Sequence, residues 1–95
     1  MTLVWGPRAR RDLHELIVCI GEDSVQAAAL VAARILESAE LLLEVPQAGR
    51  PGRVAGTREL VVLRTPYLLV YRITKRNVRI LRVYHGARRW PSRFD

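Results

Sequence analysis

Few side chains in this sequence can exchange protons near neutral pH. Its 95 residues include two histidines, His14 and His85, and one cysteine, Cys19. A single cysteine excludes an intrachain disulfide, and two histidines with scattered carboxylates do not form the ligand cluster that a structural zinc ion needs. We therefore expect no metal and no other cofactor. We single out His85 for acid–base chemistry; the alternative is a structural histidine at the end of a strand.

Arginine is the other residue type in this sequence that could take part in binding or catalysis. Fifteen of the sixteen cationic residues are Arg, whose guanidinium forms bidentate contacts with phosphates and carboxylates. Residues 1–49 carry four Arg against seven Asp or Glu, a net charge of −3, whereas residues 50–95 carry twelve Arg or Lys against two acidic residues, a net charge of +10. A codon bias could explain why Arg is used in place of Lys. It does not explain why the positive charge lies in the C-terminal half of the chain. The asymmetry predicts a polyanionic or acidic partner.

Two helices are expected in the N-terminal half. Residues 2–5 are typical of a short strand that ends at Gly6-Pro7. Apolar residues at helical spacing then predict an amphipathic helix over residues 8–20, ending near Gly21. Ser24 is a plausible N-cap for a second helix that runs to Leu43, and residues 21–23 would join the two as a helical hairpin.

The C-terminal half has the pattern of a β-sheet. Residues 46–56 are rich in Gly and Pro and predict a loop. Residues 58–64, 67–73 and 78–84 are rich in β-branched and aromatic residues, and the short turns between them predict an antiparallel meander. Strict alternation in the last strand would place His85 with Arg79, Leu81 and Val83, and Arg82 and Tyr84 on the opposite face with Val78 and Ile80.

These elements give an α+β fold of order β-α-α-β-β-β, with the helical hairpin packed on a curved antiparallel sheet. At 95 residues we expect one domain over residues 1–95. No apolar stretch reaches the length of a membrane span, and the N-terminus lacks the pattern of a secretory signal. The expected location is the cytoplasm, without membrane contact.

Several segments, in this order, resemble toxins of the RelE/ParE superfamily. They are Ala9-Arg-Arg-Asp-Leu13, Gly49-Arg-Pro-Gly-Arg53, Gly56-Thr-Arg-Glu-Leu-Val61, Pro66-Tyr-Leu-Leu-Val-Tyr-Arg-Ile73 and Val78-Arg-Ile-Leu-Arg-Val-Tyr-His-Gly-Ala-Arg-Arg-Trp-Pro91. The resemblance implies the toxin of a bacterial type II toxin–antitoxin pair, which arrests growth and is neutralised in a hetero-oligomer with a cognate antitoxin. It implies one of two targets: the ribosome and its mRNA for RelE-like members, or DNA gyrase for ParE-like members.

A RelE-like endoribonuclease needs a general base, a general acid and cations that stabilise the charged phosphorane. Under the resemblance, the candidates for these roles are His85, Arg82, Arg58 and Tyr84, while Arg64, Arg88 and Arg89 would bind the target or its phosphates. The expected antitoxin-binding residues are Leu13, Leu16 and Ile20, with Arg72 and Arg79 at the rim. The alternative for the three apolar residues is the intramolecular core.

One position departs from the RelE-like pattern. RelE-like ribonucleases often carry Arg directly after the Tyr that corresponds to Tyr67, where this chain has Leu68, and the lysines often found on the preceding strand are absent. A ParE-like gyrase inhibitor is therefore favoured, with a RelE-like mRNA endoribonuclease as the alternative. A third alternative is a basic nucleic-acid-binding module.

Overall fold

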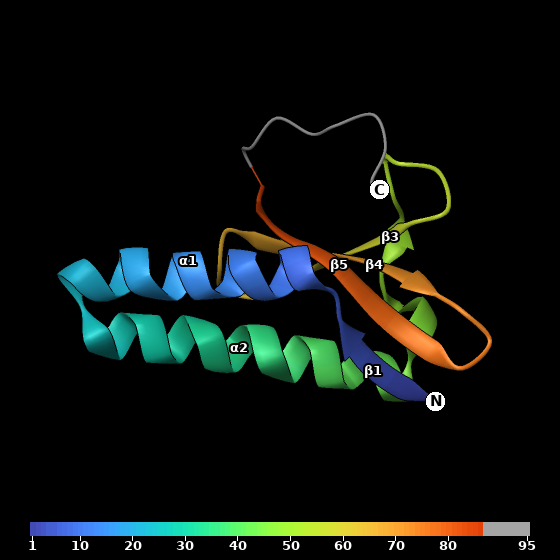
Figure 1. The fold of residues 1–95 in the computed structure, drawn as a ribbon, viewed down its shortest axis with the longest axis horizontal. Helices are drawn as coiled ribbons and strands as arrows, with labels where there is room; N and C mark the ends of the chain where they lie inside the picture. The colour runs from blue at the N-terminus through green and yellow to red at the C-terminus, as the bar shows by residue number, and fades with distance from the viewer. Residues whose placement is uncertain (87–95) are drawn as a thin grey trace.

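Two helices cover one face of a five-stranded sheet in the computed structural model, which describes residues 1–86 (Figure 1). The expected α+β order is confirmed, with one additional strand. The elements are β1 (Thr2–Trp5), α1 (Pro7–Asp23), α2 (Val25–Glu44), the 3₁₀ helix η1 (Pro46–Ala48), β2 (Arg50–Pro51), β3 (Arg58–Val61), β4 (Tyr67–Ile73) and β5 (Asn77–His85).

The strand order in the sheet is β1-β5-β4-β3-β2. The predicted antiparallel meander of β3, β4 and β5 is confirmed. The sheet as a whole is mixed, because β1 pairs in parallel with residues Asn77–Ile80 of β5. The loop predicted over residues 46–56 also contains η1 and the two-residue strand β2, which pairs with β3. A strand of two residues has no periodicity that sequence analysis can detect.

The helical hairpin turns at Ser24 and not at Gly21. Helix α1 continues through Gly21 to Asp23, so the predicted end was too early. Ser24 is extended, with φ −156°, and its Oγ accepts a hydrogen bond of 3.0 Å from the Ala27 N–H, which confirms the predicted N-cap. One extended residue is therefore enough to separate the antiparallel helices seen in Figure 1.

The core forms between the two layers. Ile35 and Leu42 of α2, Leu69 of β4 and Ile80 of β5 are fully buried in one cluster. Each such side chain contributes about 1.5–3 kcal/mol relative to exposure. This cluster fixes the helices on the sheet.

Tyr71 ties the sheet to the segment after α2. Its buried hydroxyl donates to the Pro46 carbonyl at 2.7 Å and accepts from the Gly49 N–H at 2.9 Å. A Cβ at position 49 would lie 2.6 Å from the Tyr71 Oη and 2.7 Å from the Glu59 carbonyl oxygen, so only glycine fits there. The Tyr71 hydroxyl therefore anchors η1 to the sheet.

Tyr71→Phe is expected to lower the free energy of unfolding by about 1–3 kcal/mol, because the substitution leaves the buried Gly49 N–H without an acceptor. Urea denaturation measures this change. Tyr67→Phe is the control, since no hydrogen bond of the Tyr67 hydroxyl is found within residues 1–86, and it should cost distinctly less. Equal losses in the two variants would contradict the anchoring role.

A β-bulge in β5 corrects the predicted faces of that strand. Val70 pairs with Arg82 and Tyr71 pairs with Ile80, so Leu81 is an extra residue without a partner on β4. The alternation therefore shifts after Ile80. Val83 joins the core cluster with Ile80, whereas Arg82 and Tyr84 lie opposite Val70 and Leu68 on the other face.

Within residues 1–86, neither helix combines the length and the apolar character that a membrane span requires. The same part of the chain holds no group of three or more His, Cys, Asp or Glu residues able to bind a metal ion.

Candidate functional site

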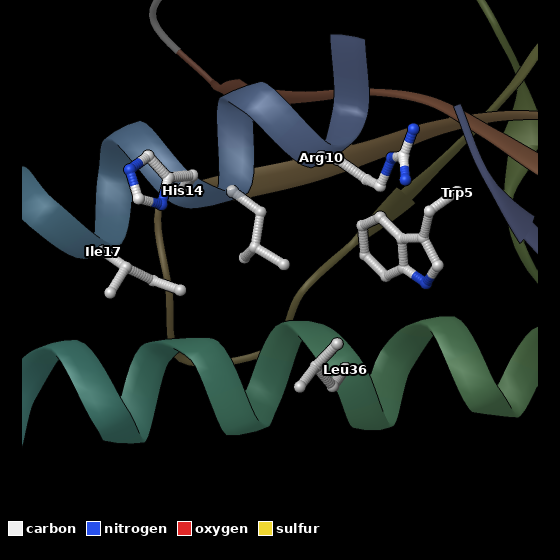
Figure 2. Close-up of a pocket in the computed structure, with 6 residues that line it drawn as sticks. Trp5, Arg10, His14, Ile17 and Leu36 are labelled. Carbon is white, nitrogen blue, oxygen red and sulfur yellow. The ribbon is translucent and has the colours of Figure 1, made fainter. Parts of the chain in front are cut away.

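An open cavity of about 340 Å³ lies between the two helices, next to the end of β1 (Figure 2). Trp5, Leu13, Ile17 and Leu36 supply its apolar lining. Figure 2 shows Ile17 on α1 and Leu36 on α2, with the Trp5 ring in the space between the two helices. We call the cavity lined by Trp5, Arg10, Leu13, His14, Ile17 and Leu36 the hairpin groove.

The spacing of residues on α1 brings the α1 side chains that line this groove to one side of the helix. Leu13 and Ile17 are four residues apart on α1, as are Arg10 and His14, so each pair lies on one side of the helix. Leu36 remains 45% exposed although it is a large apolar residue. An apolar floor with a basic rim suits a segment that presents apolar side chains and carboxylates.

The predicted antitoxin-binding residues do not all reach this surface. Leu13 lines the hairpin groove, but Leu16 is 8% exposed and belongs to the core cluster, and Ile20 packs against that cluster. Arg72 and Arg79 are exposed on the face of the sheet that the helices do not cover. Sequence analysis missed Trp5 and Leu36, because a groove between distant elements appears only when the helices are placed.

Arg82 forms a bidentate ion pair with Asp12 of α1. Its Nε and Nη2 donate to the two carboxylate oxygens at 2.8 and 3.0 Å, and the Val83 N–H donates to the same carboxylate at 2.9 Å. The hydrogen bond to Asp12 raises the pKa of Arg82 above its usual value. The side chains of Arg82 and Asp12 are only 15% and 9% exposed, so the pair holds α1 to β5.

Asp12 also supplies a hydrogen-bond acceptor to the C-terminal part of β5. Strand β1 ends opposite Ile80, so it offers no partner to residues 81–85. The Asp12 carboxylate accepts the Val83 N–H in place of a neighbouring strand. The Arg82 guanidinium then stacks on the Tyr84 ring, with 4.5 Å between the guanidinium carbon and the ring centroid.

Two other candidate arginines, Arg58 and Arg64, lie within the described residues. Arg58 donates from Nε to the Gly49 carbonyl at 2.9 Å and from Nη2 to the Gln47 carbonyl at 3.3 Å. Arg64 is exposed in the β3–β4 turn at φ 62°, and its carbonyl accepts from Arg34 Nη1 at 3.1 Å. Arg88 and Arg89 lie outside the described residues.

His85 lies on the helix-facing side of the sheet, in a second cavity of about 270 Å³ lined also by Asp12, Glu15, Leu16, Cys19, Tyr67 and Val83. Its ring meets the Tyr67 ring edge to face, with centroids 5.7 Å apart. Burial, and to a lesser extent the nearby Cys19, raise the pKa of Tyr67.

The four candidate nuclease residues therefore do not share one site. His85 faces the helices, Tyr84 lies on the opposite face of the sheet, the Arg82 guanidinium is bound to Asp12 of α1, and Arg58 binds the segment before β2. Sequence analysis predicted that His85 and Tyr84 would project to opposite faces, and they do. The predicted position of Arg82 beside Tyr84 is correct, but neither the bulge nor the contact with Asp12 was predicted.

Comparisons with known proteins agree with the fold. Residues 3–90 match the family model described as the ParE toxin of the type II toxin–antitoxin system parDE. The chain is 47% identical to a candidate toxin, Y4kP, of Sinorhizobium fredii, over 93% of this chain and 91% of the relative. It is 40% identical to Toxin RelE2 of Caulobacter vibrioides, over 90% of this chain and 96% of the relative.

A solved structure of the chromosomal ParDE toxin–antitoxin system from P. aeruginosa superposes with a TM-score of 0.80 at 27% identity, over 90% of this chain and 95% of the solved one. The family model covers nearly the whole chain, and the helical hairpin on a mixed sheet matches the solved neighbour. The chain belongs to the ParE toxin family of type II toxin–antitoxin systems.

Proposed function

We propose that this toxin arrests growth by binding and inhibiting DNA gyrase, without cutting RNA. The observation that carries the proposal is the placement of the four candidate nuclease residues. Arg82 is paired with Asp12 through two hydrogen bonds, and Arg58 is bonded to two backbone carbonyls. Neither guanidinium is available for a phosphorane without breaking contacts that hold the fold.

Cleavage of a phosphodiester also requires its acid and base to reach the same reacting phosphate. His85 lines a cavity on the helix-facing side, whereas Tyr84 lies on the opposite face and is only 2% exposed, so Tyr84 is poorly placed to act on a phosphate bound beside His85. Together with Leu68 at the position where RelE-like ribonucleases often carry Arg, this separation supports action through surface recognition.

A cognate antitoxin neutralises the toxin by occupying the hairpin groove, in a hetero-oligomer in the cytoplasm. Support comes from the apolar floor of Leu13, Ile17 and Leu36 and from the basic rim of Arg10 and His14. An antitoxin segment that fits this groove is amphipathic, with carboxylates toward α1.

A RelE-like endoribonuclease is the second candidate, and the His85 cavity is the observation that favours it. His85, Tyr67 and Glu15 line the same cavity and could supply acid–base groups. Such an enzyme would depend on His85 and would need cations other than Arg82 and Arg58.

Expression of the toxin without its antitoxin distinguishes the two functions. RNA ends are mapped in the same cultures in which plasmid topology is followed on a gel. The proposal predicts altered supercoiling without new RNA ends, and unchanged growth arrest by His85→Ala. New RNA ends that disappear in His85→Ala, with normal supercoiling, would replace the proposal by the endoribonuclease.

A further inference from the structure

Four cationic side chains gather at one end of the β4–β5 hairpin. Arg72 and Arg79 are directly paired across the two strands, and both are exposed on the face of the sheet that the helices leave open. Lys75 and Arg76 are exposed in the turn that joins these strands. We call Arg72, Lys75, Arg76 and Arg79 the hairpin basic patch.

The patch differs from the other arginines of the sheet in its partners. Arg50 and Arg53 share the buried carboxylate of Glu59, at 3.1 and 3.5 Å, and Arg82 pairs with Asp12. Within residues 1–86, no ion pair is found for any of the four patch residues. The one hydrogen bond of a patch side chain in that range joins Arg72 Nε to the Gly56 carbonyl at 3.4 Å.

Arg72 and Arg79 occupy directly opposed positions on the two strands, and their guanidinium groups lie toward Gly56 and Gly6 respectively, so the positive charge is spread across the sheet. Hydrogen bonds order the backbone of the turn that carries Lys75 and Arg76. Asn77 N–H donates to Thr74 Oγ1 at 3.0 Å, Thr74 N–H donates to the Asn77 carbonyl at 2.8 Å, and the Thr2 N–H donates to the Arg76 carbonyl at 2.9 Å. A polyanion bound along the patch would contact these charges on an already ordered turn.

The surroundings of the patch distinguish the kinds of anionic partner. A protein segment normally docks with apolar anchors, and none of the exposed large apolar side chains within residues 1–86 lies on β4 or β5. Tyr71 and Tyr84 of these strands are buried, and Tyr67 lies on the helix-facing side against His85, so none of the three offers a ring beside the patch on which a nucleobase could stack. What remains is a set of exposed positive charges on an ordered hairpin, which suits a chain of phosphates.

We propose that the hairpin basic patch binds the phosphodiester backbone of nucleic acid, independently of base sequence. The patch lies on the opposite layer from the hairpin groove, so a bound nucleic acid and an antitoxin in the groove contact different faces. The proposal does not depend on whether the toxin's target is gyrase or the ribosome.

The test measures binding of purified toxin to a short fluorescein-labelled DNA duplex of random sequence, by anisotropy, between about 50 and 200 mM salt. Arg72→Gln/Arg79→Gln is expected to weaken binding about tenfold and to reduce the slope of log K against log salt by about 2. Arg8→Gln/Arg11→Gln is the matched control, because it removes two exposed arginines of α1 and the same net charge. The control should stay within about twofold of the wild type.

Because both side chains are exposed and the one hydrogen bond between them and the rest of residues 1–86 is long, the patch variant should unfold at about the same temperature as the wild type. Lys75→Gln/Arg76→Gln, at the turn, gives a second variant with the same expected loss of binding. Single-stranded DNA and RNA of the same sequence identify which nucleic acid supplies the phosphates.

Three outcomes would overturn the proposal. The first is an equal loss in the patch and control variants, which would indicate attraction by net charge alone. The second is the absence of binding to all three nucleic acids. The third is that polyglutamate displaces the labelled duplex as effectively as unlabelled duplex does. That result would indicate a surface for acidic polypeptides.

Discussion

Asp12→Ala is expected to lower the free energy of unfolding by about 3 kcal/mol or more, the largest loss from any single substitution discussed for this fold. The substitution leaves the Arg82 guanidinium, whose side chain is 15% exposed, without its carboxylate partner. It also leaves the Val83 N–H at the edge of β5 without its acceptor. Urea denaturation followed by circular dichroism measures the change.

Glu15→Ala is the matched control for Asp12→Ala. Glu15 is the next acidic residue on α1 and is exposed, and no hydrogen bond or ion pair of its side chain is found within residues 1–86, so its removal should cost less than about 0.5 kcal/mol. In the double variant Asp12→Ala/Arg82→Ala the loss should be smaller than the sum of the two single losses. Additive losses would mean that the two side chains do not stabilise the fold as a pair.

Leu36→Glu is expected to weaken antitoxin binding by about 2–3 kcal/mol, roughly 30-fold to 150-fold in Kd. The new carboxylate would lie on the α2 side of the apolar floor of the hairpin groove, where a bound segment excludes water. Since Leu36 is 45% exposed in the free toxin, the fold should tolerate the substitution. Isothermal titration of each toxin variant with the cognate antitoxin measures the effect.

Leu30→Glu provides the comparison for Leu36→Glu. Leu30 is a 51% exposed leucine on the same helix, but it does not line the hairpin groove. The same charge placed there should leave antitoxin affinity within about twofold of the wild type. If both variants lose affinity equally, the antitoxin binds across α2 in general and the groove is not its site.

The parts of the fold with a clear local signal could be predicted from the sequence. The apolar periodicity of α2, the N-cap at Ser24 and the three meander strands each follow from neighbouring residues, and all were found. The parallel partner of β1 could not be predicted, because a four-residue strand says nothing about which distant strand it will join. The bulge at Leu81 was missed because no Gly or Pro marks it.

The candidate site was harder to predict for a related reason. Arg82 and Asp12 are 70 residues apart in the chain, so no spacing rule connects them. Arg82, which the sequence offered as a candidate catalytic group, thus also links α1 to β5 through Asp12. Trp5 and Leu36 likewise form one groove only because the helices pack beside β1.

The most direct test of the proposed function is inhibition of DNA gyrase by the purified toxin in a supercoiling assay. The test compares the wild type with Asp12→Asn/Arg82→Gln, a variant that keeps donors and acceptors at the pair but removes both charges. The account predicts that both folded proteins inhibit supercoiling with similar potency, because Arg82 is structural and no bond is cut. Normal supercoiling in the presence of excess folded wild-type toxin would contradict it.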